Sequence, residues 1–334
     1  MKLIRILLFP VVPIYFLITW LRNQFYELEI YKSKTYSFPI IGVGNLSTGG
    51  TGKTPMVEYL IRLLNSQKKV ATLSRGYGRK TKGFLLANEE ATADSIGDEP
   101  FQFYNKFKSD TQVAVCEDRQ NGIATLRQLK QKPEVIILDD AYQHRKVKAG
   151  FYVLLTSYGK LYTNDMVLPT GNLREPKSGA KRAQVIVVTK CPVNILKKEK
   201  EDIIRALNPL PHQEVFFSSI AYSDQVYFES GNTLLKDLEK VNLITGIANP
   251  QPLVDYLKQI SVKFNHLKFG DHHHFTASEI EEFEKLDTIL TTEKDFMRLK
   301  MYPSIQHKLF YLPITITIDR REDFDKKILE FVAN

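Results

Sequence analysis

Cysteine is scarce in this sequence, which excludes small folds that are held together by disulfide bonds. Only Cys116 and Cys191 occur among 334 residues. Two cysteines cannot form a disulfide framework, so a reducing compartment is expected. No cysteine and histidine spacing typical of structural zinc is present, although three of the seven histidines are adjacent. Long Lys/Arg runs interleaved with aromatic residues are also missing, so nucleic acid is not an expected partner.

Long hydrophobic runs are missing as well, with one exception near the N-terminus. Residues 6–21 contain no charged side chain, but Pro10 and Pro13 interrupt them. These sixteen residues are fewer than the roughly 20 that a spanning helix needs, and prolines disfavour a straight helix. No small-residue cleavage site follows, which argues against a signal peptide. A buried structural helix and a membrane anchor, spanning or interfacial, both remain open, and the anchor is favoured.

The composition is otherwise that of a globular protein of about two domains. Apolar residues make up 43% and charged residues 25% of the chain, which excludes disordered and polytopic membrane proteins. The formal net charge of +8 suits an anionic partner such as an acidic membrane or a phosphate-bearing substrate.

Short apolar segments alternate with helical patterns along the first two thirds of the chain, which predicts a doubly wound, mostly parallel α/β sheet. The expected strands are residues 39–43, 70–73, 113–116, 135–138, 152–155 and 185–188. A second, smaller α/β domain is expected from strands at residues 241–245, 266–269, 289–292 and 311–318. The predicted organisation is an apolar anchor helix and lead-in (1–37), a P-loop NTPase-type core domain (38–212), a connecting β-ribbon (213–240) and a C-terminal α/β domain that closes the active site (241–334).

The strongest local motif is a glycine-rich loop between an expected strand and an amphipathic helix, in residues 40–55. Glycines let backbone N–H groups turn towards phosphate oxygens, and the helix N-terminus adds a favourable dipole. Lys53 would reach the β- and γ-phosphates and the Thr54 hydroxyl would ligate Mg²⁺. Ser47 stands where such loops usually begin with glycine. The predicted nucleotide-binding residues are Ser47, Thr48, Gly49, Gly50, Thr51, Gly52, Lys53 and Thr54.

Two carboxylates follow another expected strand, at Asp139 and Asp140. The carboxyl ends of parallel strands face the ligand crevice, so Asp139 is the expected metal partner of Thr54. A guanine-recognition motif of the Asn-Lys-x-Asp type is missing. Thr189 and Lys190 stand at such a place but lack the aspartate, so ATP is favoured over GTP.

Six motifs occur in a specific order: GNLSTGGTGKTP, LSRGYGR, IGDEP, LDDAYQHR, LREP and FGDHHHF. Together with the apolar N-terminus they closely resemble the tetraacyldisaccharide 4′-kinase family, over most of the chain. The resemblance implies Mg²⁺- and ATP-dependent phosphorylation of the 4′-hydroxyl of a tetraacylated glucosamine disaccharide 1-phosphate, a lipid A precursor, to give lipid IVA. It also implies anchoring at the cytoplasmic face of the inner membrane, with membrane lipids as partners; no protein partner is indicated.

The resemblance further implies roles for individual residues. It makes Asp98 the proton acceptor, paired with His272, and counts Lys53 and Asp140 among the catalytic residues. It adds Glu175 to the metal ligands Thr54 and Asp139. The residues implied on the substrate side are Asn45, Arg75, Tyr77, Gln143, His144 and Arg174.

One departure concerns residues 141 and 142, where the family usually has glycine and phenylalanine and this chain has Ala141 and Tyr142. The loss of a glycine makes the expected backbone beside Asp140 less well defined. Two alternative functions remain open: a P-loop kinase for another sugar or lipid, and a membrane-bound nucleotide switch.

Overall fold

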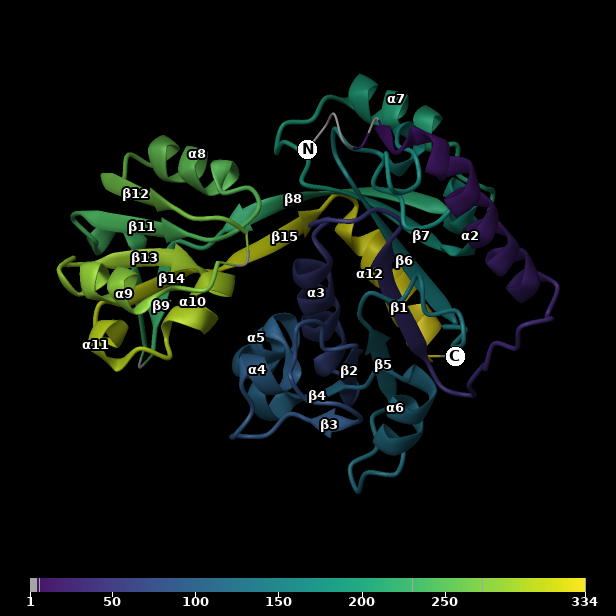
Figure 1. The fold of residues 1–334 in the computed structure, drawn as a ribbon, viewed down its shortest axis with the longest axis horizontal. Coiled ribbons are helices and arrows are strands. Elements are labelled where there is room, and N and C mark those ends of the chain that lie inside the picture. Colours follow the sequence, from purple (N-terminus) through teal and green to yellow (C-terminus); the bar gives the residue numbers. More distant parts are fainter. Residues whose placement is uncertain (1–4, 6, 230, 272, 334) are drawn as a thin grey trace.

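Two α/β units joined by a pair of long strands make up the computed structural model (Figure 1), which describes all residues except 1–4, 6, 230, 272 and 334. Strands β8 (Glu214–Tyr222) and β15 (Ile314–Ile318) run from the larger unit to the smaller one and pair antiparallel. The ribbon expected within residues 213–240 differs from the one observed, because the partner of β8 is β15, from the C-terminal part of the chain.

The larger unit is built on a nine-stranded sheet in the order β15-β8-β7-β6-β1-β5-β2-β4-β3. Strands β8 through β4 in this order are parallel, whereas β15 and β3 pair antiparallel at the edges. The strands not yet given are β1 (Ile40–Asn45), β2 (Val70–Ser74), β3 (Leu85–Leu86), β4 (Thr111–Val115), β5 (Val135–Leu138), β6 (Phe151–Ser157) and β7 (Val185–Thr189). All six strands expected in this region are confirmed.

Helices cover both faces of this sheet because its central strands are apolar throughout. Ile40 and Ile41 are neighbours in β1 but point into different cores, as the alternation of a strand requires. On one face pack α3 (Lys53–Asn65), α5 (Asp98–Phe107) and α12 (Arg321–Ala333). On the other face pack α6 (Arg119–Leu126), α7 (Lys197–Leu207) and part of α2 (Val12–Glu27).

The smaller unit holds a six-stranded sheet in the order β10-β9-β14-β13-β11-β12. Its strands are β9 (Gln225–Phe228), β10 (Gly231–Leu234), β11 (Val241–Thr245), β12 (Phe264–Lys268), β13 (Ile289–Thr292) and β14 (Leu309–Leu312). Its helices are α8 (Gln251–Gln259), α9 (Ala277–Glu284), α10 (Glu293–Leu299) and α11 (Pro303–Gln306). The second α/β block is confirmed, and the N-terminus of α9 has the predicted capping box, in which Thr276 and Glu279 exchange hydrogen bonds.

The chain returns to the larger unit at its C-terminal end, which differs from the expected boundary. Residues 311–318 were expected as one strand, but Pro313 separates β14 from β15, because proline cannot donate to the ladder of a sheet. Beyond β15, α12 buries Phe324 and Ile328 in the core of the larger unit. Residues 314–333 thus belong to the larger unit, with β15 in its sheet and α12 packed against it, and the smaller unit ends with β14.

Helix α2 begins after a short 3₁₀ turn at Phe9–Val11 and runs along the outer edge of the larger unit, away from the smaller one (Figure 1). Pro13 lies in its first turn, where a missing N–H costs little, so the helix is not broken. Large apolar side chains of α2 remain exposed, including Ile14, Leu17 and Ile18. Within the described residues, no helix combines the length and apolarity needed to cross a bilayer.

Candidate active site

The glycine-rich loop connects β1 to α3 at the carboxyl edge of the first sheet. Gly49 and Gly52 have φ values of +97° and +84°, in the left-handed region that glycine adopts without strain. Gly52 caps α3, whose first turn contains no acidic residue. Thr48, Gly49 and Gly50 are exposed at the loop tip. The loop is therefore open to an anion, with the positive end of α3 at its base.

Asn45, at the end of β1, links the loop to the rest of the site. Its amide Nδ2 donates to Thr51 Oγ1 over 2.7 Å, and its side chain is fully buried. Its carbonyl oxygen accepts from Gln143 Nε2 over 3.1 Å. Asn45 was predicted on the substrate side, but here it braces the phosphate loop. The first half of the loop is held by residues 172–174, because Thr48 N donates to the carbonyl oxygen of Asn172 over 2.7 Å.

Asp139 lies at the end of β5, next to β1, and is 8% exposed. Ser74 Oγ donates to its Oδ2 over 3.3 Å, whereas its buried Oδ1 has no hydrogen-bond partner among the described residues. Burial and the neighbouring Asp140 charge raise the pKa of Asp139 to about 6. A buried carboxylate oxygen without a hydrogen-bond partner, beside a phosphate loop, is well placed to coordinate a cation.

Asp140 adopts a left-handed backbone, with φ at +50°, which turns its carboxylate towards the loop. Lys53 Nζ lies 3.6 Å from its Oδ1, and Arg174 donates two hydrogen bonds to it. Burial alone would raise the pKa of Asp140, but the Arg174 hydrogen bonds and the Lys53 charge outweigh it and hold the pKa well below its usual range.

The two unusual residues after Asp140 fit without disturbing the carboxylates. Ala141 donates its N–H to the carbonyl oxygen of Val43 over 2.9 Å, which continues the pairing of β5 with β1. Tyr142 is buried against Tyr152, and a Cβ on Gly44 would lie only 2.8 Å from the Tyr142 ring. Gly44 is thus required because the ring lies directly on the strand.

Gln143, His144, Arg75 and Tyr77 were predicted on the substrate side. Arg75 and Tyr77 follow β2 and are both exposed, with Tyr77 at 83%. Burial, together with the charges of Arg119 and Arg75, lowers the pKa of His144 to about 4. A neutral His144 and a cationic Arg75 therefore face the same region, which suits an anionic sugar ligand.

Glu175 was predicted as a metal ligand, and it is 2% exposed and surrounded by donors. Its carboxylate accepts from Asn23 Nδ2 over 3.0 Å, Gln143 Nε2 over 2.9 Å and Arg182 Nη2 over 2.6 Å. The contact with Asn23 shows that α2 reaches the site with its polar side. Nearby, the hydroxyl of Tyr15 donates to the carbonyl oxygen of Arg174 over 3.0 Å.

Asp98 begins α5 and forms an ion pair with Arg298 of α10, in the smaller unit. Arg298 also lies 3.5 Å from Asp295, a fully buried carboxylate that accepts from the N–H of Gly246 over 2.8 Å. The predicted partner His272 lies outside the described residues. Its neighbour His273 stacks on Phe269 and pairs with Glu279 at 3.0 Å, a packing role within the smaller unit.

Several residues of the site carry no motif in the sequence. Asn23 and Arg298 come from segments distant in the chain from Glu175 and Asp98, whereas Arg119 and Arg182 lie 20 and 7 residues from Asp139 and Glu175, outside the six motifs. Arg119 is 3% exposed and donates to the carbonyl oxygen of Asp139 over 2.8 Å. Isolated arginines in polar segments are normally solvated, so only the fold identifies them.

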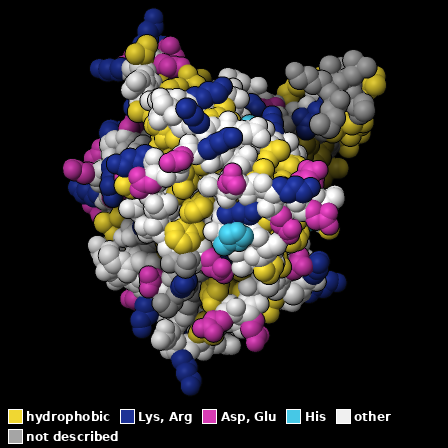
Figure 2. All heavy atoms as spheres, turned by 90° about the vertical axis from the view of Figure 1, so that its left-hand side faces the viewer, with side chains coloured by type: hydrophobic (Ala, Val, Ile, Leu, Met, Phe, Trp, Pro, Cys, Tyr) yellow, Lys and Arg dark blue, Asp and Glu magenta, His cyan; other side chains and the backbone are white. Residues whose placement is uncertain are grey.

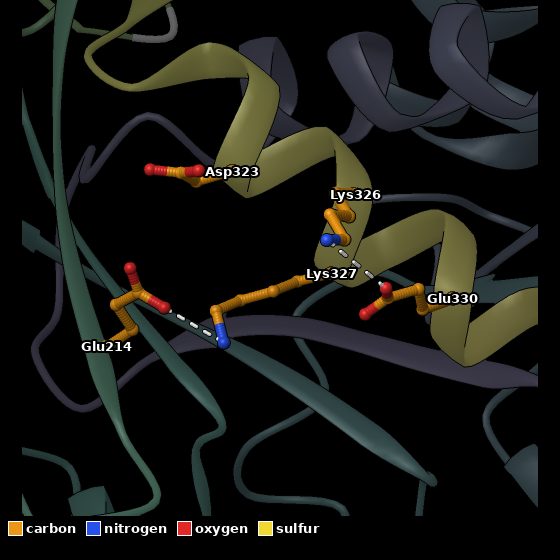
Figure 3. A pocket seen from close by; sticks show the side chains of 5 residues that line it. All are labelled: Glu214, Asp323, Lys326, Lys327 and Glu330. Carbon is orange, nitrogen blue, oxygen red and sulfur yellow. Dashed lines mark ion pairs between the residues drawn. The ribbon is translucent and has the colours of Figure 1, made fainter.

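The remaining surface features are poor ligand sites. The hollow between β8 and α12 is lined by Glu214, Asp323, Lys326, Lys327 and Glu330 (Figure 3). Lys327 pairs with Glu214 at 2.8 Å and Lys326 with Glu330 at 3.8 Å, so the charges there satisfy one another. Acidic and basic side chains are also interspersed on the face drawn in Figure 2, which gives that face no field of one sign among the described residues.

Comparisons with known proteins agree on one family. The family model described as tetraacyldisaccharide-1-P 4′-kinase matches residues 4–333. A tetraacyldisaccharide 4′-kinase of Flavobacterium johnsoniae is 48% identical, covering 99% of this chain and 98% of that one; one of Phocaeicola vulgatus is 42% identical, covering 97% and 94%. A crystal structure of LpxK from Aquifex aeolicus in complex with ATP superposes with a TM-score of 0.81 at 31% identity, covering 98% of this chain and 99% of that chain.

Proposed function

This chain belongs to the tetraacyldisaccharide-1-P 4′-kinase family, and from that premise we propose that it transfers the γ-phosphoryl group of ATP to the 4′-hydroxyl of a tetraacyldisaccharide 1-phosphate, giving lipid IVA. One observation carries the proposal within the structure. The phosphate loop and the Asp139–Asp140 pair lie on adjacent strands, with Lys53 and Arg174 converging on Asp140. This is the arrangement that phosphoryl transfer requires, because the reaction depends on positioning and on neutralising charge.

The phosphate loop would hold the triphosphate. The N-terminus of α3 supplies a positive dipole and Lys53 supplies a full charge, whereas the N–H groups of Thr48 and Thr51 already donate to the carbonyl oxygens of Asn172 and Gly49. Asp140 keeps Lys53 and Arg174 together at the mouth of the loop, where both cations can contact the transferring phosphoryl group.

Magnesium fits the oxygens near the loop. Asp139 Oδ1 is buried and unpaired among the described residues, and Thr54 follows Lys53 in the first turn of α3. Bound there, Mg²⁺ would neutralise charge on the β- and γ-phosphates. Glu175 would coordinate the metal only if it gave up one of the three hydrogen bonds that it accepts. Within the described residues, no group of three or more histidine, cysteine, aspartate or glutamate side chains is placed to hold a metal ion.

Asp98 is proposed as the acceptor of the proton from the sugar hydroxyl, assisted by His272. Asp98 lies at the N-terminus of α5 and at the contact with the smaller unit, through Arg298. The base would thus be held between the two units. Arg75 and Tyr77 are exposed beyond β2 and are proposed to contact the sugar 1-phosphate.

Membrane association is proposed for α2 at the cytoplasmic face of the inner membrane. Its exposed apolar side chains suit the acyl chains of the substrate and the bilayer interface, whereas Tyr15 and Asn23 contact the protein. The helix would lie at the interface, so that the lipid acceptor enters the site beside it.

A transfer assay tests the proposal. Radiolabelled ATP and a purified tetraacyldisaccharide 1-phosphate should yield labelled lipid IVA, and chemical analysis should place the label at the 4′ position. Label in another sugar or lipid would indicate a different kinase, and release of inorganic phosphate without transfer would indicate a nucleotide switch. Lys53→Ala protein serves as the inactive control.

A further inference from the structure

Thr189 and Lys190, at the end of β7, have no role in the function proposed above. Strand β7 lies two positions from β1 in the sheet, and both strands are parallel. The carboxyl end of β7 therefore reaches the same edge as the phosphate loop. At this place a nucleotide-binding protein can contact its ligand, yet this chain has no aspartate there to recognise a base.

Both side chains contact the backbone of the phosphate loop directly. Thr189 Oγ1 lies 2.8 Å from the carbonyl oxygen of Thr51 and 3.2 Å from that of Thr156, and it can donate to one of them at a time. Lys190 Nζ donates to the carbonyl oxygen of Gly50 over 2.5 Å. Thr189 is 3% exposed, so its hydroxyl has no alternative partner in bulk water.

Lys190 reaches the loop at a cost in backbone conformation. Its φ is +60°, in the left-handed region that residues with a Cβ rarely adopt. Such outliers persist only where the surroundings enforce them, and they cluster at functional sites. Partial desolvation lowers the pKa of Lys190, although its side chain remains exposed to solvent.

Holding these two carbonyls fixes the direction of the peptides that follow them. In a planar trans peptide the C=O of one residue points away from the N–H of the next. When the Thr51 carbonyl faces Thr189, the N–H of Gly52 faces away from β7. Likewise, the Gly50 carbonyl faces Lys190, and the N–H of Thr51 turns inward to the carbonyl oxygen of Gly49, 3.1 Å away. Glycine peptides rotate easily, so an external constraint matters most here.

We infer that Thr189 and Lys190 are positioning residues for ATP, which pre-order the phosphate loop by holding the Gly50 and Thr51 carbonyls towards β7. The inference rests on the proposed function, since it concerns the loop that binds the nucleotide. Pre-ordering lowers the entropy lost on binding, so it strengthens affinity without a direct contact to the ligand.

The test compares four variants with a matched control on the full-length protein. Thr189→Val and Lys190→Met remove the two contacts, and Thr189→Ser retains the hydroxyl. Lys190→Gly removes the amine but also relieves the left-handed strain. Lys160→Met is the control, because Lys160 is an exposed lysine close enough to influence the charge of Lys190. Calorimetry gives Kd for Mg-ATP and Mg-ADP, kinetics give KM for ATP and for the lipid acceptor, and thermal unfolding gives Tm.

Thr189→Val and Lys190→Met should each raise Kd for both nucleotides about three- to tenfold, the loss expected for one hydrogen bond. KM for the lipid acceptor should stay at the wild-type value. Tm should be unchanged in Lys190→Met and lower in Thr189→Val, which leaves buried carbonyls without a donor, and Thr189→Ser should bind nearly as wild type. Lys190→Gly should weaken ATP binding although its Tm is unchanged or higher, which a purely structural role does not predict. Lys160→Met should change Kd less than about twofold.

Wild-type nucleotide affinity in both Thr189→Val and Lys190→Met would overturn the inference. If Thr189→Val fails to fold, the two Lys190 variants decide the question alone. Failure of the wild-type chain to bind ATP or to phosphorylate the lipid would instead overturn the proposed function, so the two failures are distinct.

Discussion

Arg174 and Asp140 form a two-pronged ion pair in which Nη1 lies 2.8 Å from Oδ2 and Nη2 lies 2.8 Å from Oδ1. Asp139, the residue before Asp140, instead accepts a hydrogen bond from the uncharged Ser74 hydroxyl. The two adjacent carboxyls consequently have pKa values displaced in opposite directions, with that of Asp139 raised and that of Asp140 lowered. Neighbouring carboxyls with divergent pKa values indicate divided roles. Asp140 is a fixed anion that organises cations, whereas the buried Oδ1 of Asp139 is suited to contact a metal ion.

Replacing Arg174 with lysine should lower kcat about 10- to 100-fold, because an ammonium group cannot bridge both oxygens of Asp140. The measurement is steady-state transfer to the lipid acceptor at saturating ATP. Arg205→Lys, which changes an exposed pair with Asp202, is the control and should behave as wild type. Full activity of Arg174→Lys would show that charge alone is sufficient at this position.

Lys53→Ala should reduce kcat about 100- to 1,000-fold, the loss typical of removing one group that stabilises a transition state. Folding should be preserved, since the Lys53 side chain is partly exposed and its ammonium group pairs with Asp140 at the loop. Circular dichroism and Tm check the fold, and Lys69→Ala, an exposed lysine away from the loop, is the control. Turnover near that of wild type would remove the loop from the mechanism.

Asp98→Ala and His272→Ala should each lower kcat strongly with little change in nucleotide affinity. If the two side chains act as a unit, the double variant should be barely worse than the poorer single variant. Asp139→Ala should differ, because it should impair binding of Mg-ATP. Measuring kcat for both single variants and the double variant at saturating substrates decides between the models. Fully multiplicative losses would establish independent roles for Asp98 and His272.

Glu293 should make stability depend on pH. It shares Lys106 with Glu58 at the contact of α10 with α3 and α5, and burial together with the Glu58 charge raises its pKa from 4.5 to about 7. As the pH rises from 4.5 to 7, the unfolded chain loses this proton while the folded chain keeps it. This group therefore lowers stability across that window, and its effect then levels off.

Glu293→Gln should abolish that contribution, since glutamine mimics the protonated acid. Urea unfolding should be measured at about pH 5, 6 and 7, which lie between the pKa values of Glu293 in the unfolded and folded chains. The free energy of unfolding of the variant should increase relative to that of wild type as the pH rises. Glu284→Gln, at an exposed position on α9, should leave the slope unchanged. Parallel curves for Glu293→Gln and wild type would contradict the assignment.

Deleting residues 1–21 should make the chain more soluble in detergent-free buffer without preventing ATP binding. Turnover should nevertheless fall, because the deletion removes the hydrogen bond from Tyr15 to the Arg174 carbonyl and leaves Asn23 without its helix. The triple variant Ile14→Ser, Leu17→Ser and Ile18→Ser should bind vesicles less well, and its turnover of detergent-dispersed substrate should stay at the wild-type level. If the chain without residues 1–21 sediments with membranes as efficiently as wild type, the membrane anchor lies elsewhere.

Local patterns were sufficient to predict the strands of the first sheet and the places of the phosphate loop and of Asp139 at the ends of two of them. Apolar segments bounded by turns predict β1, β5 and β7, because buried parallel strands are apolar on both faces. The phosphate loop and Asp139 are also local, since each lies where a strand ends.

Contacts between distant segments were not predictable in this way. Arg298 meets Asp98 across 200 residues, and Asn23 meets Glu175 across 152. No spacing rule links such residues, and each alone has the composition of an ordinary surface position. The return of β15 was hidden for a different reason, because Pro313 interrupts what reads as one apolar segment and gives no sign that the second half joins another sheet.

That return also sets the order in which the protein can be completed during synthesis. Strand β8 can pair with β15 only after about 90 further residues have been synthesised. The entropic cost of closing this loop between the two strands grows only slowly with its length. Until α12 leaves the ribosome, the surface that receives Phe324 and Ile328 beside α3 stays exposed on an otherwise finished sheet. A chain stopped after β14 would carry every residue of the phosphate loop and still lack part of the core beneath it. Chaperones and proteases would therefore respond to the presence or absence of the last twenty residues more than to the active site itself.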